Sequence, residues 1–327
     1  MVGWSVYAGW NPWYYMGKSG ILRKWADKYN ISIRVQRFDY AASLDAFVAK
    51  NIDACAMTNM EALDMPAASG VETTAIITGD YSNGNDAILA RKNLTLQQLP
   101  GNRMLLVQKT VSQYLFERAM TLNGLEAQIK KVKLVNTSDT DIATAFIADT
   151  NQDSVATWKP MVSQIAKAKG VKLLFSSAQI PGEILDLMVV RTEILNRTDG
   201  SGQRFAKALA GAWYETMRQM SAAGSDKVLR EIAAAAEDTL ESYKEQLSTT
   251  NLFYTPASAV AFTSAPDFKQ KMNLVRQFCF THGLLGGVAA ADDVAIAYPD
   301  GTIQGKPNRV RLRFDISYMK LAQQGGL

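Results

Sequence analysis

Predicted strands and helices alternate along this 327-residue chain as far as Arg191. Residues 31–38 alternate apolar and polar side chains, which is the pattern of a half-buried strand. A short helical pattern follows and ends near Asn51, and residues 54–58 predict the next strand. Units in which a helix joins two strands build a mostly parallel sheet that is covered by helices. The sequence therefore predicts an α/β fold.

A second block of alternating strands and helices runs from Arg103 to residue 190. Long segments with apolar residues at helical spacing follow it. We therefore predict two domains: residues 1–90 together with residues 191–327, and residues 91–190. The chain would pass between them twice. Two such crossings form a hinge that closes around a ligand, and the interface between two domains is a favoured place for a small-molecule site.

The overall composition restricts the classes of partner. The chain is 47% hydrophobic and 20% charged, as is usual for a globular protein. Its net charge of +4 is too small to indicate nucleic-acid binding. No run approaches the roughly 18 consecutive apolar residues that a membrane span needs. Met1 and Val2 lead directly into a strand, as in a mature exported chain with an added start methionine.

The few cysteines and the single histidine argue against catalysis. Cys55 and Cys279 lie far apart in apolar surroundings, which predicts buried free thiols and no metal site. Catalysis by a Ser-His or Cys-His pair would depend on His282 alone. His282 follows an apolar helix, where a structural role at the helix C-terminus is the better interpretation. We expect no catalytic residue, no metal and no cofactor.

Residues 6–15 join a strand to a helix through a short aromatic loop. The strand pattern breaks at Gly9, and proline suits the first turn of the helix that follows. Trp10, Asn11 and Trp13 therefore lie at the carboxyl end of a strand, where open α/β sheets bind ligands. Two indoles and an amide suit a small, flat or cationic ligand. The alternative is that both tryptophans are packing residues.

Several stretches of the chain resemble a known family of binding proteins. They are residues 7–13, 21–25, 38–40, 51–53 and 79–86. These stretches resemble the periplasmic solute-binding proteins of ABC importers, in the nitrate/taurine/sulfonate group that is related to thiamine-pyrimidine-synthase-like proteins. More narrowly, they are similar to the urea- or guanidine-binding proteins associated with urea carboxylase. The resemblance covers essentially the whole chain.

This resemblance implies a type II periplasmic-binding-protein fold. Each lobe would be a mostly parallel sheet flanked by helices, and two strands would form the hinge. It also implies a periplasmic or other extracytoplasmic location, a small-molecule ligand and an ABC permease as the membrane partner. We further expect a monomer without enzymatic activity or cofactor.

The resemblance places the ligand between the lobes, at the ends of strands. The expected ligand-binding residues are Trp10, Asn11, Trp13, Asn59, Asp80, Tyr81, Ser82, Asp86, Thr110, Ser112, Asp139, Trp158 and Glu183. For some of these residues a structural role is the alternative. Asn59 and Asp86 could serve as turn residues, Thr110 and Asp139 as helix caps, and Glu183 as part of a solvated turn.

The charges of the candidate loops bear on the class of ligand. These loops hold the carboxylates of Asp80, Asp86, Asp139 and Glu183, with only Lys109 and Lys159 nearby. A guanidinium group can donate two hydrogen bonds to a carboxylate while it stacks on an indole. We therefore expect a guanidine-like cation or urea. A sulfonate or oxyanion such as taurine or nitrate is the alternative, and it would need donors and usually a cation.

Two further classes of protein share this pattern of elements. One is an enzyme similar to the pyrimidine synthases, whose chemistry relies on a lysine-bound cofactor and on histidine. A chain with one helical histidine, His282, fits that chemistry poorly. The other is a sensor domain, and we see no signalling or DNA-binding region attached to this sequence.

Overall fold

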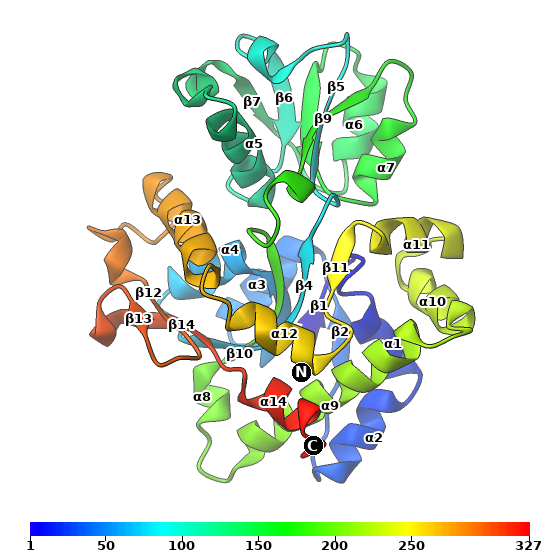
Figure 1. The fold of residues 1–327 in the computed structure, drawn as a ribbon, viewed down its shortest axis with the longest axis vertical. Coiled ribbons are helices and arrows are strands. Elements are labelled where there is room, and N and C mark those ends of the chain that lie inside the picture. The colour runs from blue at the N-terminus through cyan, green and yellow to red at the C-terminus, as the bar shows by residue number, and fades with distance from the viewer. The chain divides into compact units, whose positions relative to one another are not determined.

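The computed structural model describes residues 1–327, and the chain divides into two compact units (Figure 1). Unit 1 comprises Met1–Tyr81 and Leu185–Leu327, and unit 2 comprises Ser82–Ile184. The boundaries that we predicted lie further along the chain at both crossings. Strand pairing explains the difference, because β5 (Ala87–Ala90) belongs to the sheet of unit 2 and β10 (Leu185–Arg191) belongs to that of unit 1.

Unit 1 contains a nine-stranded sheet in the order β13-β12-β14-β4-β10-β3-β1-β2, with β11 paired to β4. Besides β10, its strands are β1 (Val2–Trp4), β2 (Val35–Arg37), β3 (Ala54–Thr58), β4 (Thr73–Ser82), β11 (Thr250–Leu252), β12 (Ala295–Ala297), β13 (Ile303–Gln304) and β14 (Val310–Phe314). Strand β10 runs antiparallel to both β3 and β4. The β1–β2, β1–β3 and β4–β14 pairs are parallel. The sheet is therefore mixed at its centre.

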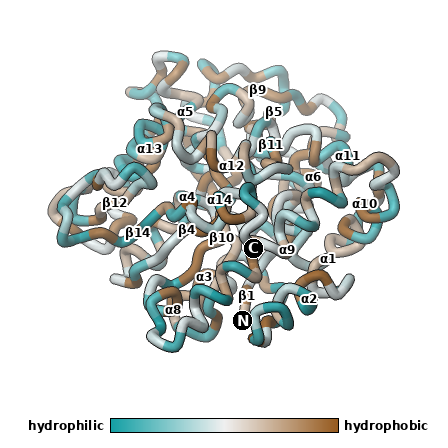
Figure 2. Tube along the Cα trace, turned by 60° about the horizontal axis from the view of Figure 1, so that its bottom comes forward, coloured by the Kyte–Doolittle hydropathy of each residue, from teal (hydrophilic) through white to brown (hydrophobic).

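Helices cover this sheet. They are α1 (Pro12–Lys18), α2 (Ile21–Lys28), α3 (Tyr40–Val48), α4 (Asn59–Ala62), α8 (Thr192–Leu195), α9 (Ser201–Ser221), α10 (Asp226–Ala233), α11 (Leu240–Leu247), α12 (Pro256–Thr263), α13 (Phe268–Thr281) and α14 (Ser317–Gln323). The longest, α9, packs against α2. The contact is close because a Cβ atom at Gly211 would meet the ring of Trp25 at 2.3 Å. Figure 2 shows β10 as a hydrophobic segment and α10 with both hydrophilic and hydrophobic stretches.

Unit 2 contains a five-stranded sheet in the order β7-β6-β8-β5-β9. Its other elements are β6 (Arg103–Leu106), β7 (Lys133–Asn136), β8 (Ser154–Thr157), β9 (Lys172–Ser176), α5 (Val111–Leu122), α6 (Ile142–Ala148) and α7 (Met161–Ala166). Strand β6 is parallel to β7 and β8, whereas β5 is antiparallel to β8 and β9. Leu105, Phe146, Val155 and Ile165 are buried in one core between sheet and helices. The predicted α/β class, with helices flanking each sheet, is confirmed.

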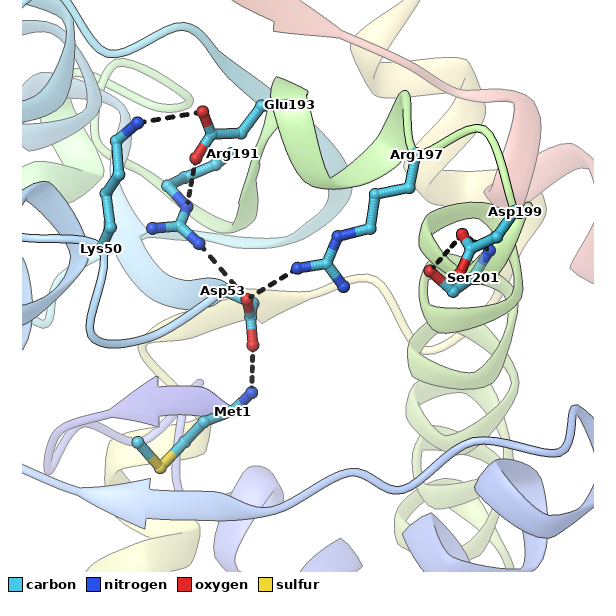
Figure 3. A network of polar contacts seen from close by, with 8 residues as sticks. All are labelled: Met1, Lys50, Asp53, Arg191, Glu193, Arg197, Asp199 and Ser201. Carbon is cyan, nitrogen blue, oxygen red and sulfur yellow. Dashed lines mark hydrogen bonds and ion pairs between the residues drawn. The ribbon is translucent and has the colours of Figure 1, made fainter.

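An ionic network in unit 1 connects the N-terminus, Asp53 and the end of β10 (Figure 3). The carboxylate of Asp53 contacts the Met1 ammonium group and lies 3.3 Å from Nη2 of Arg191. Arg191 ends β10, is buried and also lies 3.5 Å from Glu193. Because a buried charge is costly without a partner, this network stabilises the end of the central strand. Across all 327 residues, no helix combines the length and the apolar character that crossing a membrane requires.

Candidate functional site

The loop after β1 turns its polar and aromatic side chains into unit 1. The backbone N–H groups of Trp10 and Asn11 both donate to the carbonyl of Tyr7, at 2.9 Å each. Pro12 then starts α1. Asn11 occupies the position before that helix, yet its side chain caps no backbone group. Trp10 and Asn11 are 6% and 1% exposed, so this short turn buries both residues.

Aromatic rings form a wall around this loop. The ring of Trp10 lies 5.2 Å from that of Tyr7 and 5.1 Å from that of Tyr40. Trp13 stacks on Trp213 of α9, with ring centroids 5.3 Å apart. Aromatic pairs at these distances stabilise one another and fix the direction of each ring. The indole faces are thus held in place by neighbouring rings.

Two carboxylates lie beside this wall. Asp80 on β4 and Asp186 on β10 are directly opposite each other, and both are buried. The carboxylate of Asp80 lies against the backbone of Gly9, where an added Cβ atom would meet Oδ2 at 2.1 Å. Glycine is therefore required at residue 9 for this approach. Directly opposed residues of an antiparallel pair share one face of the sheet, so two acidic groups point to the same side.

Two tyrosines, Tyr243 and Tyr254, lie close enough to Asp80 for its charge to raise their pKa values. The hydroxyl of Tyr243 donates to the carbonyl of Ala8 at 2.9 Å. Burial raises the pKa of Tyr243 well above its usual value, and Tyr254 and Asp80 raise it further. The pKa of Tyr254 is raised by burial and by the charge of Asp80. Both phenols therefore stay protonated and can act as donors.

A small cavity of about 10 Å³ lies beside Asp80, Asp186 and the indoles, which is room for roughly one water molecule. Its walls are Gly9, Trp10, Trp13, Ile77, Gly79, Asp80, Asp186, Leu187, Met188 and Trp213. Three indoles and two carboxylates line it, and none of the lining residues is lysine, arginine or histidine. The surroundings are therefore acidic and aromatic, which suits a ligand rich in N–H donors.

The carboxylate of Glu61 holds Tyr40, whose ring packs against Trp10. The hydroxyl of Tyr40 donates to Oε2 of Glu61 at 3.0 Å and accepts from the backbone N–H of Thr58 at 3.1 Å. Burial raises the pKa of Tyr40 well above its usual value, and Glu61 raises it further. Asp64 lies one turn beyond Glu61, and its pKa is also raised, mainly by burial and then by Glu61. Tyr40 is thus fixed behind the ring of Trp10.

Two predicted ligand-binding residues of unit 1 have contacts within the fold. The side-chain oxygen of Asn59 accepts from the backbone N–H of Leu185 at 3.0 Å, and its nitrogen lies 3.5 Å from the sulfur of Met272. Tyr81 stacks on Phe262 at 5.4 Å. Asn59 connects the start of α4 to β10, which is a structural use that its sequence context did not indicate. A ligand contact at either residue stays a prediction.

The predicted residues at the start of unit 2 form a turn. Oγ of Ser82 accepts from the backbone N–H of Asp86 at 3.2 Å and lies 2.7 Å from Oγ of Ser177. Thr110 caps α5, because its hydroxyl accepts from the backbone N–H of Ser112 at 3.3 Å. The hydroxyl of Ser112 is buried without a hydrogen-bond partner. Thr110 therefore follows the cap alternative, whereas the contact with Ser82 involves only the backbone of Asp86.

Glu183 lies in a buried ion pair, so the alternative of a solvated turn is wrong. Its carboxylate receives two hydrogen bonds from Arg118, at 2.8 and 2.9 Å, and one from the hydroxyl of Tyr114 at 2.5 Å. Burial raises the pKa of Tyr114, and the negative charge of Glu183 raises it further. Asp139 and Trp158 are both half-buried in unit 2, and neither lines the cavity beside Asp80.

Sequence reasoning missed three residues of the acidic and aromatic site. Asp186 is the one charged residue in the apolar run 185–190, and that was the available signal. Trp213 and Tyr243 belong to the long segments after residue 190 whose apolar residues have helical spacing, which we interpret as core-facing helices. Both are buried as that interpretation requires, yet Trp213 also lines the cavity and Tyr243 also contacts the loop after β1.

The structure adds two observations on metals and thiols. Nowhere in the 327 residues do three or more histidine, cysteine, aspartate or glutamate side chains come together as a metal site would need. Cys55 and Cys279 are free and buried, as predicted. Burial raises the pKa of the Cys55 thiol to about 12, which leaves it unreactive.

Comparison with known proteins identifies the fold. No family model matches the sequence. No curated protein matches it either. The structure is similar to the alkanesulfonate-binding protein SsuA of Xanthomonas axonopodis pv. citri bound to MOPS, with 15% identity, a TM-score of 0.66, and 87% of this chain and 93% of that chain covered.

Two further solved structures show the range of proteins with this fold. The periplasmic aliphatic sulphonate-binding protein SsuA of Escherichia coli matches with 15% identity, a TM-score of 0.66, and coverage of 87% of this chain and 92% of that chain. The desulfurization enzyme DSZB matches with 15% identity, a TM-score of 0.57, and coverage of 89% and 94%. The chain therefore has the type II periplasmic-binding-protein fold.

Proposed function

We propose that this protein is the solute-binding component of an ABC importer, and that it captures a guanidine-like cation or urea. The observation that carries the proposal is the buried pair of Asp80 and Asp186 beside the indoles of Trp10, Trp13 and Trp213. The proposed partner is the permease of the importer, and the proposed location is periplasmic. In this proposal the protein acts as a monomer and performs no catalysis.

The electrostatics of the pair favour a nitrogenous ligand. Like charges directly opposite each other on an antiparallel pair repel, and burial removes the water that would weaken this repulsion. A ligand with several N–H donors can bind both carboxylates, and each such charged hydrogen bond contributes about 1.5–3 kcal/mol. A flat ligand can also stack on an indole face. Guanidinium and urea have both properties.

A sulfonate or oxyanion such as taurine or nitrate is the alternative ligand. It is supported by the buried hydroxyl of Ser112, which has no hydrogen-bond partner and lies in the first turn of α5. Backbone N–H groups at a helix N-terminus favour anions. The names of two similar structures also describe sulfonate binding by those proteins. An enzyme is a weaker alternative, although DSZB has a similar fold.

Thermal shift and calorimetry with four solutes test the proposal. Guanidinium chloride, urea, taurine and sodium nitrate are added at millimolar concentrations, well below those that denature proteins. A ligand at a hundredfold excess over its Kd stabilises by about 2.7 kcal/mol, which is a readily measured shift. We expect a shift with guanidinium or urea that the Asp80→Asn variant loses. Shifts with taurine or nitrate alone would reject the proposed ligand class.

A further inference from the structure

We propose that the indole N–H groups of Trp10 and Trp213 recognise an oxygen acceptor on the solute. This inference rests on the proposed function and narrows it. The ligand would be a planar nitrogenous solute that carries a carbonyl-type oxygen, as a ureido or amide group does. A guanidinium ion has no such oxygen, so it would bind with fewer hydrogen bonds to the protein.

The two indoles share three properties. Trp10 and Trp213 are only 6% and 2% exposed. Nε1 of each is buried and has no hydrogen-bond partner in the protein. Both side chains line the cavity that also contains Asp80 and Asp186. A buried donor without a partner costs about 1–3 kcal/mol, so two such donors at one cavity point to an acceptor supplied from outside the chain.

Neighbouring residues hold both rings in their present directions. The ring of Trp10 packs against those of Tyr7 and Tyr40, and Tyr40 is in turn held by Glu61. Trp213 stacks on Trp13. A Cβ atom at Gly79 would lie only 3.1 Å from the ring of Trp213. Because the rings are packed on several sides, neither indole can rotate freely to find another acceptor.

The chemistry of the cavity then divides into two parts. Asp80 and Asp186 supply the acceptors. An indole N–H can only donate. Guanidinium likewise only donates, so it can satisfy the carboxylates and leaves the indoles without an acceptor. Urea has the same planar shape, and its oxygen has two lone pairs for the two indole donors. The cavity of about 10 Å³ would have to widen to admit it.

The test compares urea with guanidinium on matched tryptophan variants. Trp10→Phe and Trp213→Phe each keep an aromatic ring and remove the N–H donor. Trp13→Phe is the control, because it removes an indole of the same cluster whose nitrogen is not among the buried atoms without a partner. Calorimetry gives the Kd of each solute for each variant. Circular dichroism and thermal unfolding without solute show that every variant is folded.

We expect urea to bind the unchanged protein, and each of the two variants to weaken urea binding about five- to tenfold, which is the loss of one neutral hydrogen bond. Guanidinium binding should change no more than it does in Trp13→Phe. Guanidinium binding without urea binding would overturn this inference and leave the proposed function standing. Equal losses for both solutes would do the same. Binding of neither solute would reject the proposed function itself.

Discussion

Asp80 and Asp186 stand directly opposite each other on β4 and β10, although 105 residues separate them along the chain. Both side chains are buried, with exposures of 0% and 3%. The cavity beside them contains three indoles and no basic side chain. This one strand pairing gives unit 1 its acidic site, and the first prediction concerns its electrostatics.

Replacing Asp186 by asparagine should raise the stability of the protein without solute and weaken ligand binding. One of two opposed charges disappears while the size of the side chain is kept, so the repulsion falls. A charged hydrogen bond to the solute is lost at the same time, which corresponds to at least a tenfold rise in Kd for guanidinium. Differential scanning calorimetry and titration calorimetry measure the two effects. Asp27→Asn, an exposed change on α2, should alter neither quantity.

Replacing Gly9 by alanine should displace the Asp80 carboxylate. The added Cβ atom would lie 2.1 Å from Oδ2 of Asp80, far inside normal contact distance. Overpacking of this kind costs about 1–3 kcal/mol. A double-mutant cycle with Asp80→Ala identifies the cause, because Gly9→Ala should cost much less once the carboxylate is gone. An unchanged cost in the Asp80→Ala background would show that another contact is responsible.

Removing the arginine of the buried ion pair in unit 2 should be severely destabilising. Arg118→Ala leaves Glu183 buried without its two hydrogen bonds from the guanidinium group. Breaking a buried pair by removing one partner costs about 3–5 kcal/mol. The double variant Arg118→Met with Glu183→Gln should recover most of this loss, because no uncompensated charge is left. Thermal unfolding of the variants measures both values, and equal stability of the single and double variants would contradict this account of the loss.

The pKa of Asp64 predicts a dependence of stability on pH. Burial, and then the charge of Glu61, raises this pKa well above the usual 3.8. The folded state therefore keeps the proton at pH values where the unfolded chain has lost it. The stabilisation is complete below about pH 3.8 and is lost as the pH rises through the folded-state pKa.

The variant Asp64→Asn cannot ionise, so it should lack this decline. Its melting temperature should exceed that of the unchanged protein by a margin that widens from pH 4 to pH 8. Melting curves of both proteins across this range give the margin at each pH. Curves that stay parallel would show that Asp64 does not contribute to the pH dependence.

Local sequence patterns were enough for much of the fold. The alternation of apolar residues located most strands and helices, because the period of burial depends on neighbouring residues in one element. Pro12 marked the start of α1 as predicted, but the first strand ends at Trp4 and not at Gly9. Patterns of this kind do not give strand partners. For that reason the predicted domain boundaries left β5 and β10 in the wrong units.

By itself, then, the sequence determined the α/β class, the aromatic loop at Trp10 and the polar stretch around Asp80, because each depends on residues close together in the chain. Only the tertiary structure decided which distant groups join them. The pairing register of β4 and β10 brings Asp186 opposite Asp80, and the packing of α9 brings Trp213 to the same cavity. It also placed Glu183 in an ion pair with Arg118. Contacts between distant segments depend on the packing of whole elements, which no local pattern records.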